Sequence, residues 1–451
     1  PAVRSTLRAD VQRVAVRALQ QHLAELKGRN VADGAVVVLD NASGDVLAWV
    51  GSSGTTSLAA EVDGAMAPRQ PGSTLKPFLY AQAIAEKRLT AASLLDDSPA
   101  QLSTAAGLYI PQNYDRQFKG WVSARTALGA SLNVPTVRTL VMVSPDAFAR
   151  QLRALGLPLK EGGDYYGFSL ALGSAEVPLL ALTNAYRALA NGGQHGGVRM
   201  RSTDGPMAKQ RALDAAAAFI TTDILADPMA RARTFGTDSL LATRFWTAVK
   251  TGTSKDMRDN WALGYSERYT VGVWVGNAAG APMHDVSGTS GAAPVWATVM
   301  QHLHRQQPSR APRPPAGLVR AGIRYAEALE ASREEWFLPG TEQAQWAAAG
   351  NDGPATARRV AAAAGHRIVS PTSGTVIALD PDIPPARQRL QLTADGPAVQ
   401  WRVNGKPLAR GREAAWMPWP GRHRIQLADA SGVVRDEVLV EVRGASVKQR
   451  R

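Results

Sequence analysis

Two neighbouring stretches of alternating apolar residues constrain the fold of this 451-residue chain more than any other feature. Their apolar positions are Trp261, Leu263 and Tyr265 in the first stretch and Tyr269, Val271, Val273 and Val275 in the second. A period of two is typical of β-strands, and the intervening Ser-Glu-Arg is short enough for a turn. The two stretches predict an antiparallel hairpin, and the apolar run Trp246–Val249 before them predicts a third strand.

The first fifty residues predict a helix followed by a second hairpin. Residues Leu7–Leu26 repeat apolar side chains at helical spacing, and the repeat ends near Gly28. The apolar runs Ala35–Leu39 and Val46–Val50 flank a polar turn that contains glycine. We therefore expect an amphipathic helix and two antiparallel strands at this end of the chain.

The stretch between the two hairpins is mainly helical. We expect helices from Lys76 to about Leu95 and over Ser144–Leu155 and Val177–Ala190, the last of which ends at Asn-Gly-Gly. Strands followed by helices and then by strands are typical of an α/β (α+β) domain with an antiparallel sheet.

Changes in composition divide the chain, which is longer than one ordinary domain. Residues 307–317 are rich in Pro and Arg, and residues 343–364 are rich in Ala. From about Arg367 short apolar runs alternate with turns such as Asn404-Gly405, which is typical of a small β-sandwich. We expect a linker helix over residues 1–30, the α/β domain over 31–306, a connector over 307–366 and the sandwich over 367–445.

The chain carries 51 Lys and Arg against 38 Asp and Glu, a formal net charge of +13. A basic surface suggests an acidic partner, such as nucleic acid, anionic lipid or an anionic wall polymer. We expect no nucleic-acid partner, because no Lys/Arg block is interleaved with aromatic residues and no zinc spacing occurs.

The chain has no cysteine, which excludes disulfides and Cys-ligated metals and fits a protein of the bacterial envelope. We expect no metal, no cofactor and, since no run of about 18 apolar residues occurs, no membrane-spanning helix.

A serine and a lysine three residues apart, Ser73 and Lys76, follow directly after Pro71-Gly72. If Pro71-Gly72 turns the chain into a helix, the two side chains share one face. A serine hydroxyl becomes a nucleophile when a base takes its proton, and a lysine kept neutral by burial and nearby cations can be that base. The pair alone is weak evidence, because a solvent-exposed Ser and Lys on a helix have the same spacing.

Two later segments strengthen the hypothesis of a catalytic serine. They are Ser131-Leu132-Asn133 and Lys250-Thr251-Gly252-Thr253. Together with the first pair they follow the order S-x-x-K, S-D-N, K-T-G of the serine acyltransferases that react with penicillin. The one departure is Leu132, which stands where that pattern has Asp.

With these three motifs the chain resembles the transpeptidase domain of bifunctional (class A) penicillin-binding proteins. The segments GDVLAWVG, RQPGSTLKP, LGSAEVPLLALTNAYRALANGG and SGTSGAAPVW carry the resemblance, which covers roughly residues 1–305. The tail from IVSPTSGTVIALDPDIPPARQRLQL onward resembles the small C-terminal domain of the 1C subfamily. The implied fold is a penicillin-binding/β-lactamase-like transpeptidase domain followed by a small C-terminal β-sandwich.

The implied activity is a serine D,D-transpeptidase that cross-links peptidoglycan stem peptides through an acyl-enzyme and is inhibited covalently by β-lactams. Ser73 would attack the carbonyl between two D-alanines, with Lys76 as its general base. Ser131 would relay a proton to the leaving amine, and Asn133 would hold the substrate backbone and Lys76. Lys250 would keep the site electropositive, which favours a neutral Lys76.

The resemblance also assigns the substrate-binding residues. The hydroxyls of Thr251 and Thr253 would bind the substrate carboxylate. Gly252 has no side chain and would let substrate lie along the strand edge. The backbone N–H groups of Ser73 and Thr253 would form the oxyanion hole.

Several alternatives remain open on the sequence. A D,D-carboxypeptidase or a β-lactamase would use water as the acceptor, and a catalytically silent penicillin-binding scaffold would keep the fold alone. Tyr109, Asn113 and Tyr114 would either line the substrate groove or pack. The tryptophans of the C-terminal segment, Trp401, Trp416 and Trp419, would bind glycan or, as we expect, pack in its core.

The resemblance further implies a longer protein with a glycosyltransferase domain and a membrane anchor upstream. Such a protein would lie at the periplasmic face of the bacterial inner membrane. Its partners would be peptidoglycan stem peptides, β-lactams as inhibitors and an envelope protein that contacts the C-terminal domain.

Overall fold

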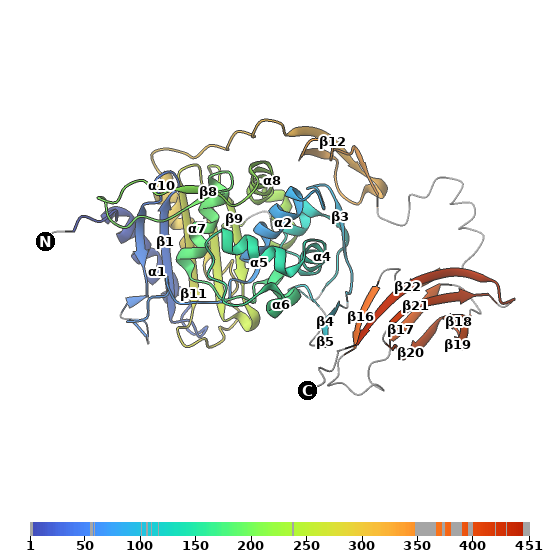
Figure 1. The fold of residues 1–451 in the computed structure, drawn as a ribbon. Helices are drawn as coiled ribbons and strands as arrows, with labels where there is room; N and C mark the ends of the chain where they lie inside the picture. Colours follow the sequence, from blue (N-terminus) through green and yellow to red (C-terminus); the bar gives the residue numbers. More distant parts are fainter. Residues whose placement is uncertain are drawn as a thin grey trace, which may run out of the picture. The chain divides into compact units, whose positions relative to one another are not determined.

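The computed structural model describes residues 3–54, 57, 59–100, 102–104, 107–109, 111–115, 117–236, 239–347, 367–371, 375–379, 390–395, 400–419, 421–429 and 431–444. The chain divides into two compact units (Figure 1). The first comprises Pro1–Ser98 and Gln112–Ala347, and the second comprises Pro99–Pro111 and Ala348–Arg451. Within the described residues no helix is both long and apolar enough to cross a membrane.

A five-stranded antiparallel sheet forms the centre of the first unit. In spatial order its strands are β2 (Val46–Val50), β1 (Asp33–Asp40), β11 (Tyr269–Gly276), β10 (Asp259–Tyr265) and β9 (Ala248–Thr253). The two hairpins that the alternating patterns predict are β1–β2 and β10–β11, and the sheet joins them because β1 pairs with β11. The antiparallel sheet and the α+β class are confirmed.

Helices lie on both faces of this sheet, and further helices pack on those (Figure 1). They are α1 (Ala9–Glu25), α2 (Lys76–Ala85), α3 (Ala124–Gly129), α4 (Asn133–Val143), α5 (Pro145–Ala154), α6 (Gly163–Tyr166), α7 (Leu179–Ala190), α8 (Ala215–Ala226), α9 (Pro228–Phe235) and α10 (Ala293–His304). Helix α7 packs so closely on β11 that a Cβ on Gly272 would lie 2.0 Å from the Thr183 hydroxyl. Helix α2 ends at Ala85, ten residues before the predicted end, because Lys87 adopts a positive φ and strand β3 (Leu94–Asp97) begins soon afterwards.

The short elements of this unit are 3-10 turns and two strand pairs. They are η2 (Gly72–Leu75), η3 (Gly167–Leu172), η4 (Lys255–Met257) and η5 (Ala326–Ala328), then β3 with β6 (Gly120–Ser123) and β7 (Gln194–Gly196) with β8 (Lys209–Arg211).

Helix α1 lies in the segment that we expected to be a linker, residues 1–30. Its buried residues, among them Leu19 and Leu23, belong to one apolar core with strands of the sheet and with Trp296 of α10. The helix also reaches strand β2, because the side-chain amide of Gln12 exchanges two hydrogen bonds of 2.8 Å with the backbone of Trp49. An amphipathic pattern gives the apolar face but not its partner, so the sequence did not distinguish a packed helix from a linker.

The segment 307–366, which we expected to be a connector, contains a folded sheet. Strands β12 (Val319–Tyr325), β13 (Arg333–Phe337) and β14 (Gln345–Trp346) form it, and Ile323, Tyr325 and Phe337 bury their side chains together with Ala92. The expectation was wrong for these strands, because Pro- and Ala-rich flanks hid short apolar runs. Most of the Ala-rich stretch lies outside the described residues.

The described part of the second unit is made of β-strands. They are β4 (Leu102–Thr104), β5 (Gly107–Tyr109), β15 (Arg367–Ser370), β16 (Thr375–Leu379), β17 (Leu390–Asp395), β18 (Gln400–Val403), β19 (Lys406–Arg410), β20 (Glu413–Trp416), β21 (Gly421–Ala428) and β22 (Val434–Gly444). Sheets in the orders β15-β17-β20 and β16-β22-β21-β18-β19 share an apolar core that includes Trp401 and Trp416. Two sheets around one core agree with the predicted β-sandwich.

Candidate active site

The turn that carries Ser73 packs against the end of strand β9. Ser73 lies in η2, and Gly72 before it has a φ of 56°, where glycine is favoured. A Cβ on Gly72 would lie 2.6 Å from the carbonyl oxygen of Thr253, so the backbone of the turn lies directly against the backbone of β9. Helix α7 also contacts this turn, because the hydroxyl of Tyr186 donates a hydrogen bond to the carbonyl oxygen of Thr74 at 2.7 Å.

Lys76, the first residue of α2, has no solvent-exposed surface. Its Nζ donates to the carbonyl oxygens of Ser131 at 2.8 Å and Leu132 at 3.1 Å and to Oδ1 of Asn133 at 2.7 Å. The Ser131 hydroxyl lies farther from it, at 3.5 Å. Among the described residues these are the hydrogen bonds of Lys76, and Ser73 is not one of the acceptors.

Ser131 and Asn133 lie on the turn between α3 and α4. Ser131 has a φ of 60°, which is strained for a residue with a side chain. Its hydroxyl accepts a hydrogen bond of 2.7 Å from Lys250 Nζ, which also donates to the carbonyl oxygen of Thr251 at 2.8 Å. The Ser131 hydroxyl thus lies between the two lysines, and the structure brings Lys76, Ser131, Asn133 and Lys250 into one hydrogen-bonded cluster.

Asn113 supports this cluster rather than lining an open groove. Its side chain is buried and donates to both carboxylate oxygens of Asp97, each at 2.8 Å. Its Oδ1 accepts from the backbone N–H of Asn133 at 2.8 Å, so it fixes the start of α4. Asp97 was not predicted from the sequence, because a single carboxylate on a short strand belongs to no motif.

The Lys-Thr-Gly-Thr segment forms the second half of β9, which pairs with β10 at one end of the described sheet. A Cβ on Gly252 would lie 2.5 Å from the carbonyl oxygen of Pro71 and 2.7 Å from Thr74. Gly252 is therefore needed for the close approach of the turn that carries Ser73, in addition to the predicted approach of substrate to the strand edge. The Thr253 hydroxyl accepts from the backbone N–H of Gly288 at 3.0 Å, which leaves its own proton available to donate.

Two buried lysines dominate the electrostatics of the cluster. Burial lowers the pKa of Lys76 well below its usual 10.5, and the charge of Lys250 lowers it further, while Asp97 opposes the shift. Burial also lowers the pKa of Lys250 to about 7, helped by the charge of Arg231. Both shifts raise the neutral fraction of these amines at a given pH.

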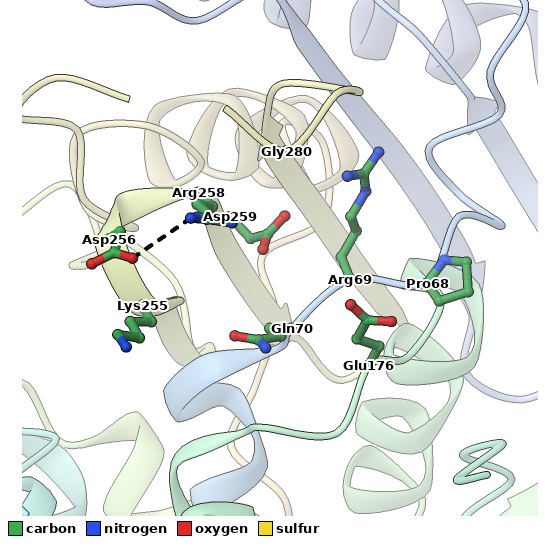
Figure 2. Close-up of a pocket in the computed structure, with 9 residues that line it drawn as sticks. All are labelled: Pro68, Arg69, Gln70, Glu176, Lys255, Asp256, Arg258, Asp259 and Gly280. Carbon is green, nitrogen blue, oxygen red and sulfur yellow. Dashed lines mark ion pairs between the residues drawn. The ribbon is translucent and has the colours of Figure 1, made fainter. Parts of the chain in front are cut away.

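A separate hollow of about 330 Å³ lies beside the turn that carries Ser73 (Figure 2). Its lining residues are Pro68, Arg69, Gln70, Glu176, Lys255, Asp256, Arg258, Asp259 and Gly280. The Arg69 guanidinium stacks on Trp274 at 5.0 Å, and Arg258 pairs with Asp256 at 3.8 Å. None of the sequence-predicted site residues lines this hollow, so the hydrogen-bonded cluster and not the cavity defines the candidate site.

The remaining aromatic candidates differ in exposure. Tyr114 is exposed, and Tyr109 belongs to the second unit. Trp401 and Trp416 are buried in the core of the sandwich, as expected, whereas Trp419 is half exposed and packs edge-on against Trp416. Among the described residues no group of three or more His, Asp and Glu side chains is arranged to hold a metal ion.

Comparison with known families gives two matches. Residues 34–301 match the penicillin binding protein transpeptidase domain, and residues 355–442 match the penicillin-binding protein C-terminus family. The chain is 36% identical over 296 residues to penicillin-binding protein 1C of Escherichia coli (strain K12), which covers 65% of this chain and 37% of that protein. It is 30% identical over 315 residues to penicillin-binding protein 1A of Neisseria lactamica, covering 65% and 38%. The chain therefore spans well under two thirds of the length of these relatives.

Solved structures show the same fold at lower identity. The PonA1 protein from Mycobacterium tuberculosis, in complex with penicillin V, superposes with a TM-score of 0.59 at 23% identity and covers 70% of this chain and 89% of that one. Penicillin-binding protein 1A from Haemophilus influenzae gives a TM-score of 0.60 at 22% identity, covering 69% and 54%. Because one family match alone spans more than half of the residues, the chain belongs to the penicillin-binding proteins, with a transpeptidase domain followed by the C-terminal domain of that family.

Proposed function

We propose that this chain is a serine D,D-transpeptidase that cross-links peptidoglycan stem peptides. The observation that carries the proposal is the cluster of Lys76, Ser131, Asn133 and Lys250, which three motifs far apart in sequence contribute beside Ser73. Two buried amines and a hydroxyl in hydrogen-bond contact can pass protons to one another. Burial of two lysines side by side costs free energy of folding, so a purely structural role does not explain it.

In the proposed reaction the Ser73 hydroxyl attacks the carbonyl between two D-alanines. Its proton passes to neutral Lys76, and the Ser131 hydroxyl donates a proton to the departing amine of the terminal D-alanine while it takes one from the Lys76 ammonium group. The acyl group stays on Ser73 as an ester. An amine of a neighbouring stem peptide then attacks this ester and gives a proton to neutral Lys76, and Ser73 leaves with a proton from Lys76 as the cross-link forms.

The backbone near Ser73 supports an oxyanion site. A Cβ on Gly72 would lie 3.1 Å from the backbone nitrogen of Thr253, so the N–H groups of Ser73 and Thr253 belong to adjoining segments. Two such donors aimed at one oxygen stabilise the charge of a tetrahedral intermediate. The hydroxyls of Thr251 and Thr253 would bind the terminal carboxylate, and Lys250 would attract it.

A fluorescent penicillin tests this proposal. We expect it to label the chain covalently at one residue, and mass spectrometry of the digested adduct should find that residue to be Ser73. Ser73→Ala should abolish labelling, whereas Ser202→Ala, at an exposed serine, should leave it unchanged. Labelling that persists in the Ser73→Ala variant would contradict the proposed nucleophile.

We further propose that the full-length protein acts at the periplasmic face of the bacterial inner membrane, where it would meet its stem-peptide substrates, and that β-lactams inhibit it. A glycosyltransferase domain upstream and an envelope partner for the C-terminal domain stay predictions from the family resemblance.

A further inference from the structure

The sheet β12–β14 lies beyond the matched transpeptidase segment, yet it contacts the helix that leads into the candidate site. Helix α3 ends at Gly129, two residues before Ser131. Its last turns hold the following backbone, because the N–H groups of Ser131 and Leu132 donate to the carbonyl oxygens of Leu128 at 3.1 Å and Ala127 at 2.9 Å. The position of α3 therefore sets the position of the Ser131 turn.

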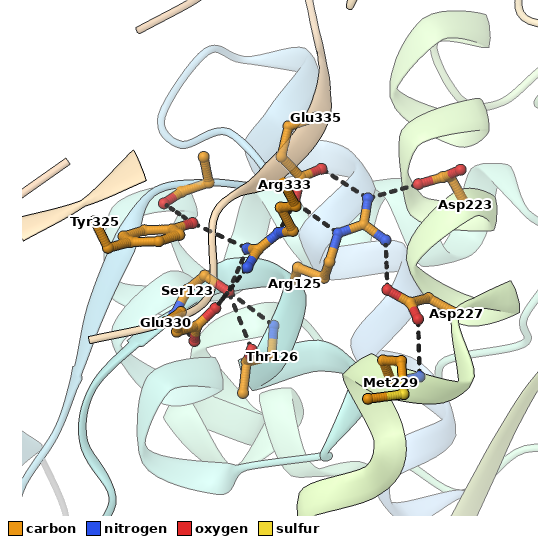
Figure 3. A network of polar contacts seen from close by, with 11 residues as sticks. Ser123, Arg125, Thr126, Asp223, Asp227, Met229, Tyr325, Glu330, Arg333 and Glu335 are labelled. Atoms are coloured by element: carbon orange, nitrogen blue, oxygen red, sulfur yellow. Dashed lines mark hydrogen bonds and ion pairs between the residues drawn. The ribbon is translucent and has the colours of Figure 1, made fainter. Parts of the chain in front are cut away.

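Two glutamates, one in strand β13 and one in the loop that precedes it, hold the first turn of α3 (Figure 3). Glu335 of β13 accepts from the Nε and Nη2 atoms of Arg125 at 2.6 and 2.7 Å, a paired arrangement that fixes direction as well as distance. Glu330 accepts from the backbone N–H of Ser123 at 2.9 Å and from its hydroxyl at 2.8 Å. Ser123 is the N-cap of α3, so both contacts fall on the start of that helix.

These contacts are shielded from water. The side chain of Glu335 is 0% exposed and that of Arg125 is 7% exposed. Arg333 ties the two glutamates to each other, since it donates to Glu335 at 2.8 Å and to Glu330 at 2.9 Å. Burial alone would lower the pKa of Arg125, but its hydrogen bond and charge interaction with Glu335 and its pairing with Asp223 outweigh that effect and raise the pKa.

Helix α3 is also held on its other side. Asp227, the N-cap of α9, accepts from Nη1 of Arg125 at 3.2 Å. Further along α9, the Thr234 hydroxyl donates to the carbonyl oxygen of Ala130 at 2.8 Å, directly before Ser131. The Arg125 side chain thus joins the sheet to two other segments that touch the Ser131 turn, α3 and α9.

From these contacts we infer that Glu335 and Glu330 are positioning residues for the reaction at Ser73. They hold α3 so that Ser131 keeps its strained backbone and Asn133 keeps its contact with Lys76. Strained turns persist only where the surroundings determine them, and the sheet supplies part of that constraint here. The inference rests on the proposed function, because it concerns the rate at which Ser73 is acylated.

The neighbouring residue Glu334 offers a matched control. It lies on the same strand with its side chain on the opposite face, 59% exposed, and pairs with Arg320 at 2.6 Å. Glu334→Gln therefore makes the same chemical change one residue away without touching α3. Time courses of labelling with a fluorescent penicillin, at several penicillin concentrations, separate the affinity of the first complex from the rate of acylation.

We expect penicillin to acylate Ser73 about tenfold more slowly in Glu335→Gln than in Glu334→Gln. The affinity of the first complex should agree within about twofold, because misplacement of catalytic groups lowers the reaction rate more than it lowers binding. The pH profile of acylation should also shift in Glu335→Gln and not in Glu334→Gln, since the surroundings of Lys76 change. Loss of folded protein would lower the labelled fraction and leave that profile in place.

Urea unfolding of each variant gives the folded fraction under the assay conditions. If Glu335→Gln does not fold, Glu330→Gln decides, because it weakens the contacts of Glu330 with Ser123 and Arg333 and leaves the pair of Arg125 and Glu335 in place. Equal acylation rates and pH profiles in folded Glu335→Gln and Glu334→Gln, or in Glu330→Gln and Glu334→Gln, would overturn the inference while the proposed function stands. Absence of labelling in the parent chain would overturn both.

Discussion

Lys76 is held in a way that suits a charged amine, whereas the proposed reaction needs a neutral one. Three oxygen acceptors at 2.7–3.1 Å use all three protons of an ammonium group. To accept the proton of Ser73, the amine has to lose one proton and free one of these acceptors. Burial and the adjacent Lys250 lower the pKa of Lys76 and so reduce the cost of that step.

The charge of Lys250 should make folding stability depend on pH. Its pKa is about 7 in the folded chain and about 10.5 in the unfolded chain, so between these values the unfolded state binds more protons and stability rises with pH. Lys250→Met removes this titration. The unfolding free energy of the variant minus that of the parent should therefore fall by on the order of 4 kcal/mol between pH 7 and pH 10.5.

Urea unfolding of parent and variant at pH 7, 8.5 and 10.5 measures this difference. Lys27→Met, at an exposed lysine, serves as the control and should show a difference that does not vary with pH. A constant difference for Lys250→Met as well would mean that burial does not depress the pKa of Lys250.

At the scale of elements, α1 should contribute to the stability of the transpeptidase unit. Leu19 is fully buried in the core that α1 shares with the sheet and α10, whereas Leu7 before the helix is 40% exposed. Leu19→Ala should lower the unfolding free energy by about 2–5 kcal/mol, and Leu7→Ala by about 0.5 kcal/mol or less. Equal urea midpoints for the two variants would show that α1 is a linker after all.

The elements that the sequence predicted well are those with a strong local pattern. Alternation marked β10 and β11, and the run Val177–Ala190 with its Asn-Gly-Gly stop marked α7. Strand β12 alternates apolar and polar residues over Val319–Tyr325 but was overlooked between Pro- and Ala-rich flanks. The buried side chains of β12 and β13 face Ala92, which lies more than two hundred residues away in sequence. Local patterns carry no information about such a partner.

The candidate site was predictable to a similar degree. The motifs supplied Ser73, Lys76 and Lys250 because the chemistry needs those residue types in that order. The contact between Lys250 and Ser131, and the support from Asn113 and Glu335, depend on how distant segments pack. No spacing rule links these positions, so only the structure brings them together.

At the scale of the whole molecule, every contact of the candidate site described above lies within the first unit. The matched C-terminal domain belongs to the second. The catalytic step should thus be a property of the transpeptidase unit with its sheet β12–β14. Whether water or an amine accepts the acyl group then depends on which of the two can be deprotonated beside Ser73.

Water is a poor acceptor here, because class A β-lactamases use a carboxylate to activate the water that hydrolyses the acyl-enzyme. Among the described residues, no carboxylate is hydrogen-bonded to the side chains of Lys76, Ser131 or Lys250. Asp97 interacts with Lys76 only through its charge, and both of its oxygens accept from Asn113. We therefore expect nitrocefin to give a burst of about one equivalent per chain, followed by slow turnover.

A thioester that mimics the D-Ala donor, supplied with and without a D-amino acid, tests the same point with an amine present. The amine should raise donor consumption and yield the aminolysis product, and Ser73→Ala should remove both this reaction and the nitrocefin burst. Donor consumed by hydrolysis alone would indicate a carboxypeptidase. Fast, sustained turnover of nitrocefin would indicate a β-lactamase, and would require a carboxylate base that the hydrogen bonds of the described residues do not bring to this site.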